Sequence, residues 1–190
     1  MHSRWYKLGL ALSVCWLSAC GPTQTVEDDT LQIAVIPKGT THEFWRSIHA
    51  GAKKAEQELV AEGQKFKIIW KGPLKEDDRD QQIQLVENFT TRRVDGMVLA
   101  PLDAQALVRP VENAQDAGIP VVIIDSGLQS EKYVSFVATD NLKGGEMAGK
   151  FMAEQLGGKG KVILLRYAVG SASTENRENG FLKALEAYPE

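Results

Sequence analysis

The most informative stretch of this sequence is Leu31-Gln32-Ile33-Ala34-Val35-Ile36-Pro37. The residues before the proline are mostly apolar and several are β-branched, which is typical of a short strand, and the proline ends the run. The apolar residues that follow recur at helical spacing up to Gly63; they are Phe44, Ile48, Ala52, Ala55 and Leu59. A buried strand that leads into an amphipathic helix is the first half of a βαβ unit.

The same alternation of strand and helix continues along the chain. We predict strands at 66–70, 96–100, 121–124 and 134–138, and helices at 79–92 and 104–117, the last interrupted by Pro110. Strands that read as continuous apolar runs are buried on both faces, as in a parallel sheet with helices on either side. Residues 31–138 are therefore expected to form an N-terminal α/β lobe.

A second group of elements follows this lobe. We predict a helix at 144–156, a strand at 161–165 and a helix at 174–188. So few elements cannot bury their apolar faces by themselves. The sequence therefore predicts an α/β fold with a doubly wound parallel-sheet lobe that is nearly complete, and residues 139–190 as the incomplete start of a C-terminal α/β lobe.

The overall composition is that of an ordinary globular protein. The chain has 190 residues, of which 43% are hydrophobic and 25% charged, and its formal net charge is −3. Nothing in it resembles the basic stripe of a nucleic-acid-binding surface, so no nucleic-acid partner is expected. The acidity is too mild to indicate disorder.

The first residues indicate export and a membrane anchor. Residues 1–19 combine a basic start, a short apolar core and small residues, which is typical of a signal peptide. Cys20 ends a string that resembles the lipobox of bacterial lipoproteins, which implies lipid on Cys20 and an anchor in the cell envelope; the alternative is a plain signal peptide with a chance cysteine. Residues 20–30 are polar and are expected to tether the lipid to the domain.

Candidate binding residues follow the predicted strands. In an open parallel α/β sheet, ligands bind beyond the carboxyl ends of the strands. Asp125 directly follows one strand and is the first candidate for an acceptor of ligand hydroxyls, the alternative being a turn or helix cap. Of Phe44 and Trp45, one is expected to pack inside and the other to line the cleft. Lys38 could be a ligand donor or a solvated loop charge, and His42 a ligand contact or an N-cap.

The candidate motifs for catalysis, metals and cofactors each lack a required feature. The glycine- and lysine-rich stretch 157–161 has neither Walker spacing nor a following Ser or Thr, and it precedes a strand rather than a helix. The stretch 170–174 lacks the second glycine of a nucleophile elbow. His2, His42 and His49 have no metal-ligand spacing. The sequence therefore favours a binding protein over an enzyme, with no cofactor and no metal.

Several ordered motifs resemble those of ribose- and galactose-type periplasmic binding proteins. They are Ile33-Ala34-Val35-Ile36-Pro37, Phe44-Trp45, Asp95-Gly96-Met97-Val98-Leu99-Ala100-Pro101, Ala117-Gly118-Ile119-Pro120, Ile124-Asp125-Ser126, Thr139-Asp140-Asn141 and the segment 170–181. The resemblance implies two lobes joined by a hinge, a sugar-like small molecule bound between them, and delivery to an ABC permease. It also implies that most of the second lobe lies beyond this chain.

The resemblance also implies a set of ligand-lining positions. They are Lys38, His42, Phe44, Trp45, Ala100, Asp125, Ser126, Thr139 and Glu175. The ribose-binding members have arginines where Ser126 and Glu175 stand and an asparagine at Ala100, so the planar guanidinium donors suited to ribose are absent. The first loop with Lys38 resembles the branch that binds a furanosyl autoinducer or deoxysugars.

Three other functions share part of this sequence pattern. The Lac-type repressors use the same two-lobe core, but they require an N-terminal DNA-binding motif where this chain has a signal peptide. An enzyme on a doubly wound sheet is disfavoured by the failed motifs. The third is a binding protein that serves a membrane sensor kinase or chemoreceptor instead of an importer, and it stays open.

Overall fold

The computed structural model describes residues 29–188. The predicted signal peptide at 1–19 and Cys20 lie outside them. The elements in chain order are β1 (Leu31–Ile36), α1 (Glu43–Ala61), β2 (Phe66–Trp70), α2 (Arg79–Thr91), β3 (Gly96–Leu99), α3 (Val108–Asp116), β4 (Val121–Ile124), β5 (Ser135–Val137), α4 (Asn141–Gln155) and α5 (Ala172–Leu185).

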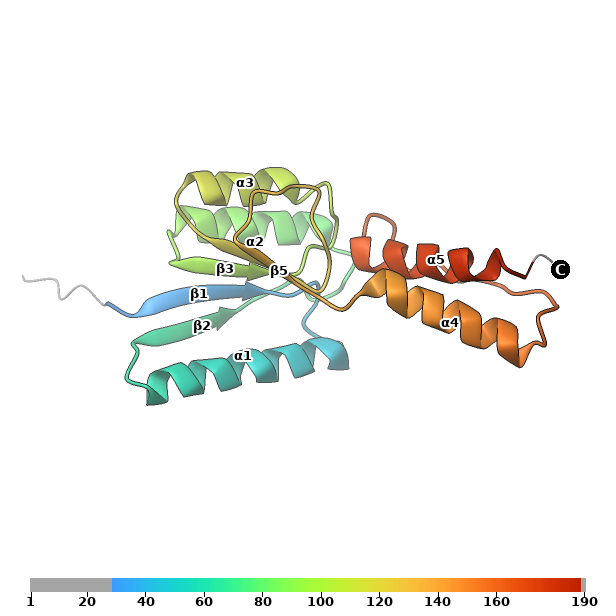
Figure 1. The fold of residues 1–190 in the computed structure, drawn as a ribbon. Coiled ribbons are helices and arrows are strands. Elements are labelled where there is room, and N and C mark those ends of the chain that lie inside the picture. The colour runs from blue at the N-terminus through green and yellow to red at the C-terminus, as the bar shows by residue number, and fades with distance from the viewer. Residues whose placement is uncertain (1–28, 189–190) are drawn as a thin grey trace, which may run out of the picture.

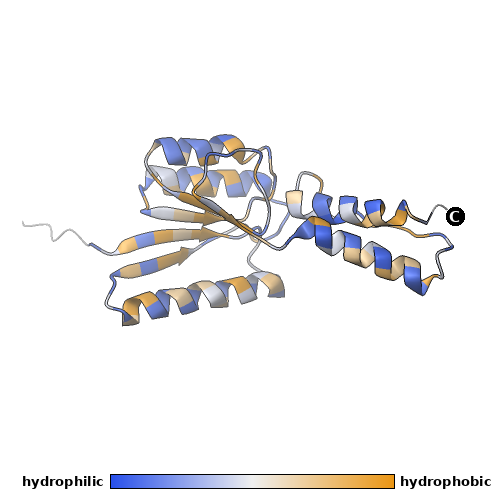
Figure 2. Cartoon of the chain, in the orientation of Figure 1, coloured by the Kyte–Doolittle hydropathy of each residue, from blue (hydrophilic) through white to orange (hydrophobic). Residues whose placement is uncertain are grey.

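The strands form one parallel sheet in the order β2-β1-β3-β4-β5. Figure 1 shows α2 and α3 on one face of this sheet and α1 on the other. Figure 2 shows apolar residues along the strands, interrupted by some polar ones, and apolar and polar residues alternating along the helices. This doubly wound α/β arrangement is the predicted fold class.

The main core lies between the sheet and the helices α2 and α3. Alternate strand residues such as Ala34, Ile36 and Leu99 are fully buried there against Val86 and Val111. Because side chains alternate across a strand, the residues between them point to the other face, where α1 packs mainly against β2. That face is only partly covered, since Val98, Val122 and Ile124 are half-buried and all of β5 is exposed.

The predicted interruption at Pro110 is wrong. Helix α3 begins at Val108, so Pro110 lies in its first turn and is buried. A proline is tolerated there because the first backbone N–H groups of a helix have no acceptor within the helix. The residues just before the helix form turns instead of extending it.

The second group of elements lies away from the sheet. Helices α4 and α5 pack against each other beyond the carboxyl ends of the strands (Figure 1). Their backbones approach closely at glycines: a Cβ on Gly180 would collide with the carbonyl oxygen of Leu142, and one on Gly149 would lie 2.6 Å from the carbonyl oxygen of Phe181. Small residues at these positions are what allow the two helices to pair.

The predicted strand at 161–165 is also wrong. The segment has no strand assignment, and Ile163 and Leu165 have 86% and 85% of their surface exposed. A strand needs a hydrogen-bonded neighbour, and no strand lies beside this segment in the part of the chain that the structure describes. Its apolar residues therefore remain uncovered.

Candidate functional site

A cavity of about 340 Å³ lies where the strand ends of the first lobe face the second segment. The first lobe contributes Lys38, His42, Phe44, Trp45 and Asp125, which follow β1 and β4 or begin α1. The second segment contributes residues around the start of α5; among them are Tyr167, Ser171, Ser173 and Arg177. Five of the nine predicted positions thus meet in one cavity.

Lys38 and Asp125 form the polar centre of this cavity. The Nζ of Lys38 lies 2.9 Å from Oδ2 of Asp125, and it donates to the hydroxyl oxygens of Ser171 and Ser173 at 3.1 Å each. Lys38 is only 5% exposed, and a buried ammonium group is stable only when its charge and donors are satisfied. Since an ammonium group has three N–H donors, these contacts use all of them.

Asp125 retains one carboxylate oxygen for a ligand. Within residues 29–188, no donor bonds its Oδ1, whereas its Oδ2 pairs with Lys38. The residue has a φ of 62°, in the left-handed region that aspartate and asparagine adopt more readily than most residues. This backbone conformation lets the chain turn at the end of β4 while the side chain lines the cavity.

The aromatic pair divides into a packed and an exposed member. Trp45 is 2% exposed, and its Nε1 donates to Oε1 of Glu76 at 2.6 Å. Phe44 is 46% exposed and contacts the Trp45 ring edge-on, with centroids 4.9 Å apart. Phe44 therefore offers accessible aromatic surface from the first lobe, and Tyr167, which is 71% exposed, offers it from the second segment.

His42 combines both roles considered from the sequence. It is the N-cap of α1, where its Nδ1 accepts a hydrogen bond from the backbone N–H of Phe44 at 3.2 Å. It also lines the cavity beside Lys38. The cap fixes the ring near the ligand space without committing its Nε2.

The other four predicted positions do not line this cavity. Ala100 and Ser126 are fully buried: the Ala100 carbonyl accepts from the Gln82 amide, and the Ser126 hydroxyl accepts from the backbone N–H of Ser173. Thr139 is exposed before α4. Glu175 accepts from the backbone N–H of Gly170 at 2.8 Å and thereby holds the loop before α5.

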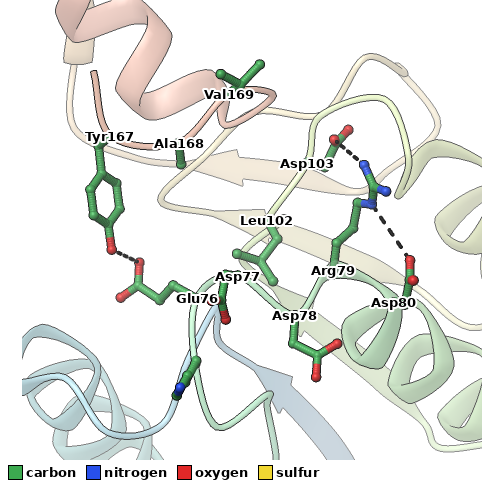
Figure 3. Close-up of a pocket in the computed structure, with 11 residues that line it drawn as sticks. Glu76, Asp77, Asp78, Arg79, Asp80, Leu102, Asp103, Tyr167, Ala168 and Val169 are labelled. Carbon is green, nitrogen blue, oxygen red and sulfur yellow. Dashed lines mark hydrogen bonds and ion pairs between the residues drawn. The ribbon is translucent and has the colours of Figure 1, made fainter. Parts of the chain in front are cut away.

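A second cavity of about 640 Å³ adjoins the first (Figure 3). Glu76, Leu102 and Tyr167 line both cavities. Figure 3 shows Tyr167 pointing toward Glu76, to which its hydroxyl donates at 3.5 Å. The Glu76 carboxylate, and then burial, raise the pKa of Tyr167.

Asp103 in this second cavity acts as a cap. Its Oδ1 accepts from the backbone N–H groups of Gln105 and Ala106, and Arg79 lies 3.4 Å from its Oδ2. Burial works to raise the pKa of Asp103, but the hydrogen bonds from Ala106 and Gln105 and the Arg79 guanidinium outweigh it, so that the pKa lies below its ordinary value. These contacts give Asp103 a structural role at the turn before α3.

Sequence reasoning missed Glu76, Ser171 and Ser173 as functional candidates. The rule that ligands bind after strand ends would have found Glu76 if the loop after β2 had been searched as well. The two serines lie in a stretch that had been dismissed as a nucleophile motif. Their role becomes visible only once Lys38 is placed beside them.

No arrangement suited to a metal ion or a membrane span is present in the described part of the chain. Residues 29–188 contain no group of three or more His, Cys, Asp or Glu side chains placed to hold a metal. None of the helices there has both the length and the apolar composition to cross a bilayer.

Comparison with known proteins identifies the family. Residues 33–190 match the family described as "Periplasmic binding protein domain". The D-ribose/D-allose-binding protein of Pseudomonas aeruginosa is 33% identical over 93% of this chain and 58% of its own length. A solute-binding protein from Agrobacterium vitis, solved with D-fucose, is 37% identical with a TM-score of 0.75 over 82% of this chain and 53% of its own. One from Agrobacterium radiobacter, solved with D-arabinose, is 32% identical with a TM-score of 0.77 over 84% of this chain and 54% of its own.

The chain thus spans between 53% and 58% of the length of these relatives. The match to the family nevertheless begins within β1 and covers every later helix and strand up to α5. The chain belongs to the periplasmic binding protein family, with the type I fold of its ribose-type members.

Proposed function

We propose that this chain forms the sugar-capturing part of a solute-binding protein of an ABC importer. The observation that carries the proposal is the cavity at the strand ends, in which Asp125 keeps an acceptor oxygen and Phe44 an exposed ring. A carboxylate acceptor beside an aromatic face suits a molecule that has hydroxyl groups on one side and C–H groups on the other. The related proteins with bound D-fucose and D-arabinose support a monosaccharide of this kind.

The related proteins are substrate-binding transport proteins rather than enzymes. We propose the same for this chain, with no catalytic step at the cavity and an ABC permease as the partner that receives the ligand. The hydrogen bonds from Lys38 of the first lobe to Ser171 and Ser173 of the second segment support capture between two lobes. On this account residues 31–138 are the first lobe and residues 139–190 begin the second.

Calorimetric titration of the full-length gene product with D-ribose, D-allose, D-fucose and D-arabinose tests the proposal. At least one sugar should bind. Asp125→Asn should weaken the binding of that sugar by about 2–3 kcal/mol, because a buried ligand hydroxyl loses a charged acceptor. Asp116→Asn is the matched control, since Asp116 is an exposed carboxylate at the end of α3. Equal affinity in wild type and Asp125→Asn would remove Asp125 from the site, and no binding of any sugar would remove the function.

The lipid anchor is part of the proposal. We propose that Cys20 carries lipid and holds the domain on the periplasmic side of a cell-envelope membrane through residues 20–30. Replacing Cys20 with Ala should move the protein from the membrane fraction to the soluble fraction. Mass spectrometry of the wild type should find acyl mass on a mature N-terminus at Cys20, and a mature N-terminus elsewhere without added mass would contradict the anchor.

A further inference from the structure

Glu76 is held in place between the two parts of the cavity wall. Glu76 lies in the loop after β2. Its Cγ packs closely on Gly39, since a Cβ added to Gly39 would lie only 2.9 Å from it. Its Oε1 accepts from Trp45 in α1, and its Oε2 accepts from Tyr167 in the second segment. A carboxylate has about four lone-pair sites, so each oxygen keeps capacity for another donor.

The charge of Glu76 is not balanced by a neighbouring cation. No Lys, Arg or His among residues 29–188 forms an ion pair with it, and its two partners, the indole of Trp45 and the phenol of Tyr167, are neutral donors. The charge of Lys38 is already offset by Asp125 at 2.9 Å. Arg177, the other cation of the cavity wall, is an exposed side chain, so solvent weakens its field.

We propose that Glu76 is a specificity-determining residue of the binding cavity: its carboxylate accepts a hydroxyl or amino donor of the ligand and disfavours a ligand carboxylate at that place. The proposal rests on the proposed sugar-binding function and adds a preference to it. An unpaired negative charge beside a half-enclosed cavity attracts an ammonium group, tolerates a hydroxyl and repels an anion. Glu76 thereby orders ligands as amino sugar, neutral sugar and sugar acid, from tightest to weakest.

A purely positioning role for Glu76 makes a different prediction. If Glu76 only fixed the Trp45 ring, Glu76→Gln would keep that role, because the glutamine amide oxygen still accepts from the indole N–H. The variant would then change no preference among ligands of different charge. Glu76→Gln also preserves the shape of the side chain, so the protein should remain folded.

The experiment compares ligands of matched shape by calorimetry on the full-length gene product. The probes are the neutral sugar that binds best among D-ribose, D-allose, D-fucose and D-arabinose, its amino-deoxy derivatives at each ring position, and its uronic acid. In the wild type the best amino derivative should bind about tenfold or more tighter than the acid. In Glu76→Gln this ratio should fall by about tenfold.

Asp77→Asn is the control for total charge. Asp77 is the next residue on the same loop and is exposed; it lines the adjoining cavity but not the one proposed to bind sugar. In Asp77→Asn the ratio of the affinities for the amino derivative and the acid should stay at the wild-type value. An unchanged ratio in Glu76→Gln, with neutral sugar still bound, overturns the role of Glu76 and leaves sugar binding intact. Failure of the wild type to bind any neutral sugar overturns both.

Discussion

Removing the charge of Lys38 should destabilise the protein strongly, because its partner Asp125 would keep a charge with no counterion. At the observed 2.9 Å, two unit charges attract by roughly 5–6 kcal/mol at an effective dielectric constant of 20. Breaking a buried pair from one side typically costs about 3–5 kcal/mol. Since the Asp125 side chain is still 16% exposed, we expect Lys38→Met to cost about 3 kcal/mol, the lower end.

A double-mutant cycle isolates the pair from other effects. Asp125→Asn is the second variant, because asparagine tolerates the left-handed backbone at this position. Urea unfolding at neutral pH should show that the double variant is more stable than the two single losses predict, by about 2 kcal/mol. A coupling free energy below about 0.5 kcal/mol would mean that the contact contributes nothing, and the account of the cavity centre would have to be abandoned.

Other side chains give further tests. Gly180→Val should lower stability by about 1–3 kcal/mol in thermal unfolding, because its side chain would meet the Leu142 backbone, whereas Gly144→Ala, which points into open space on α4, should be neutral or stabilising. Phe44→Ala should weaken sugar binding in calorimetry by about 1–2 kcal/mol and lower the unfolding midpoint only slightly, since Phe44 is 46% exposed; a lowered midpoint with unchanged affinity would contradict the role of Phe44. Because the folded-state pKa of Asp103 is lowered, its stabilising contribution is present above its unfolded-state pKa of about 4 and is lost as the pH falls through the folded value. In urea unfolding over this acidic range, the free energy of unfolding should therefore depend less on pH in Asp103→Asn than in the wild type. An equal pH dependence in both proteins would contradict this role of Asp103.

Most of the first lobe could be predicted from the sequence because its strands are short, mostly apolar runs between turn-forming residues. The runs at 66–70 and 121–124 match β2 and β4, since continuous apolar residues between turn-forming ones have few alternatives. The predicted helix at 104–117 was too long by its first turns, because periodicity does not reveal that the chain makes turns before Val108. The strand expected at 161–165 failed because pairing depends on a neighbour that local sequence does not specify.

The site was predicted less completely than the fold. The strand-end rule brought Lys38 and Asp125 together correctly in space, because parallel strands end at one edge. It could not predict that Ser171 and Ser173 satisfy the ammonium group, since that depends on how α5 is placed. Ser126 looked like a ligand position, but its hydroxyl is fully buried and bonded to the backbone of Ser173.

The central claim, that the cavity around Asp125 and Phe44 binds a sugar, is tested most directly by a crystal structure of the full-length gene product with its best-binding sugar. We expect ligand density in this cavity, with a hydroxyl group within hydrogen-bond distance of Oδ1 of Asp125 and the ring against Phe44. Density at a different place, with this cavity filled only by solvent at saturating sugar, would contradict the account.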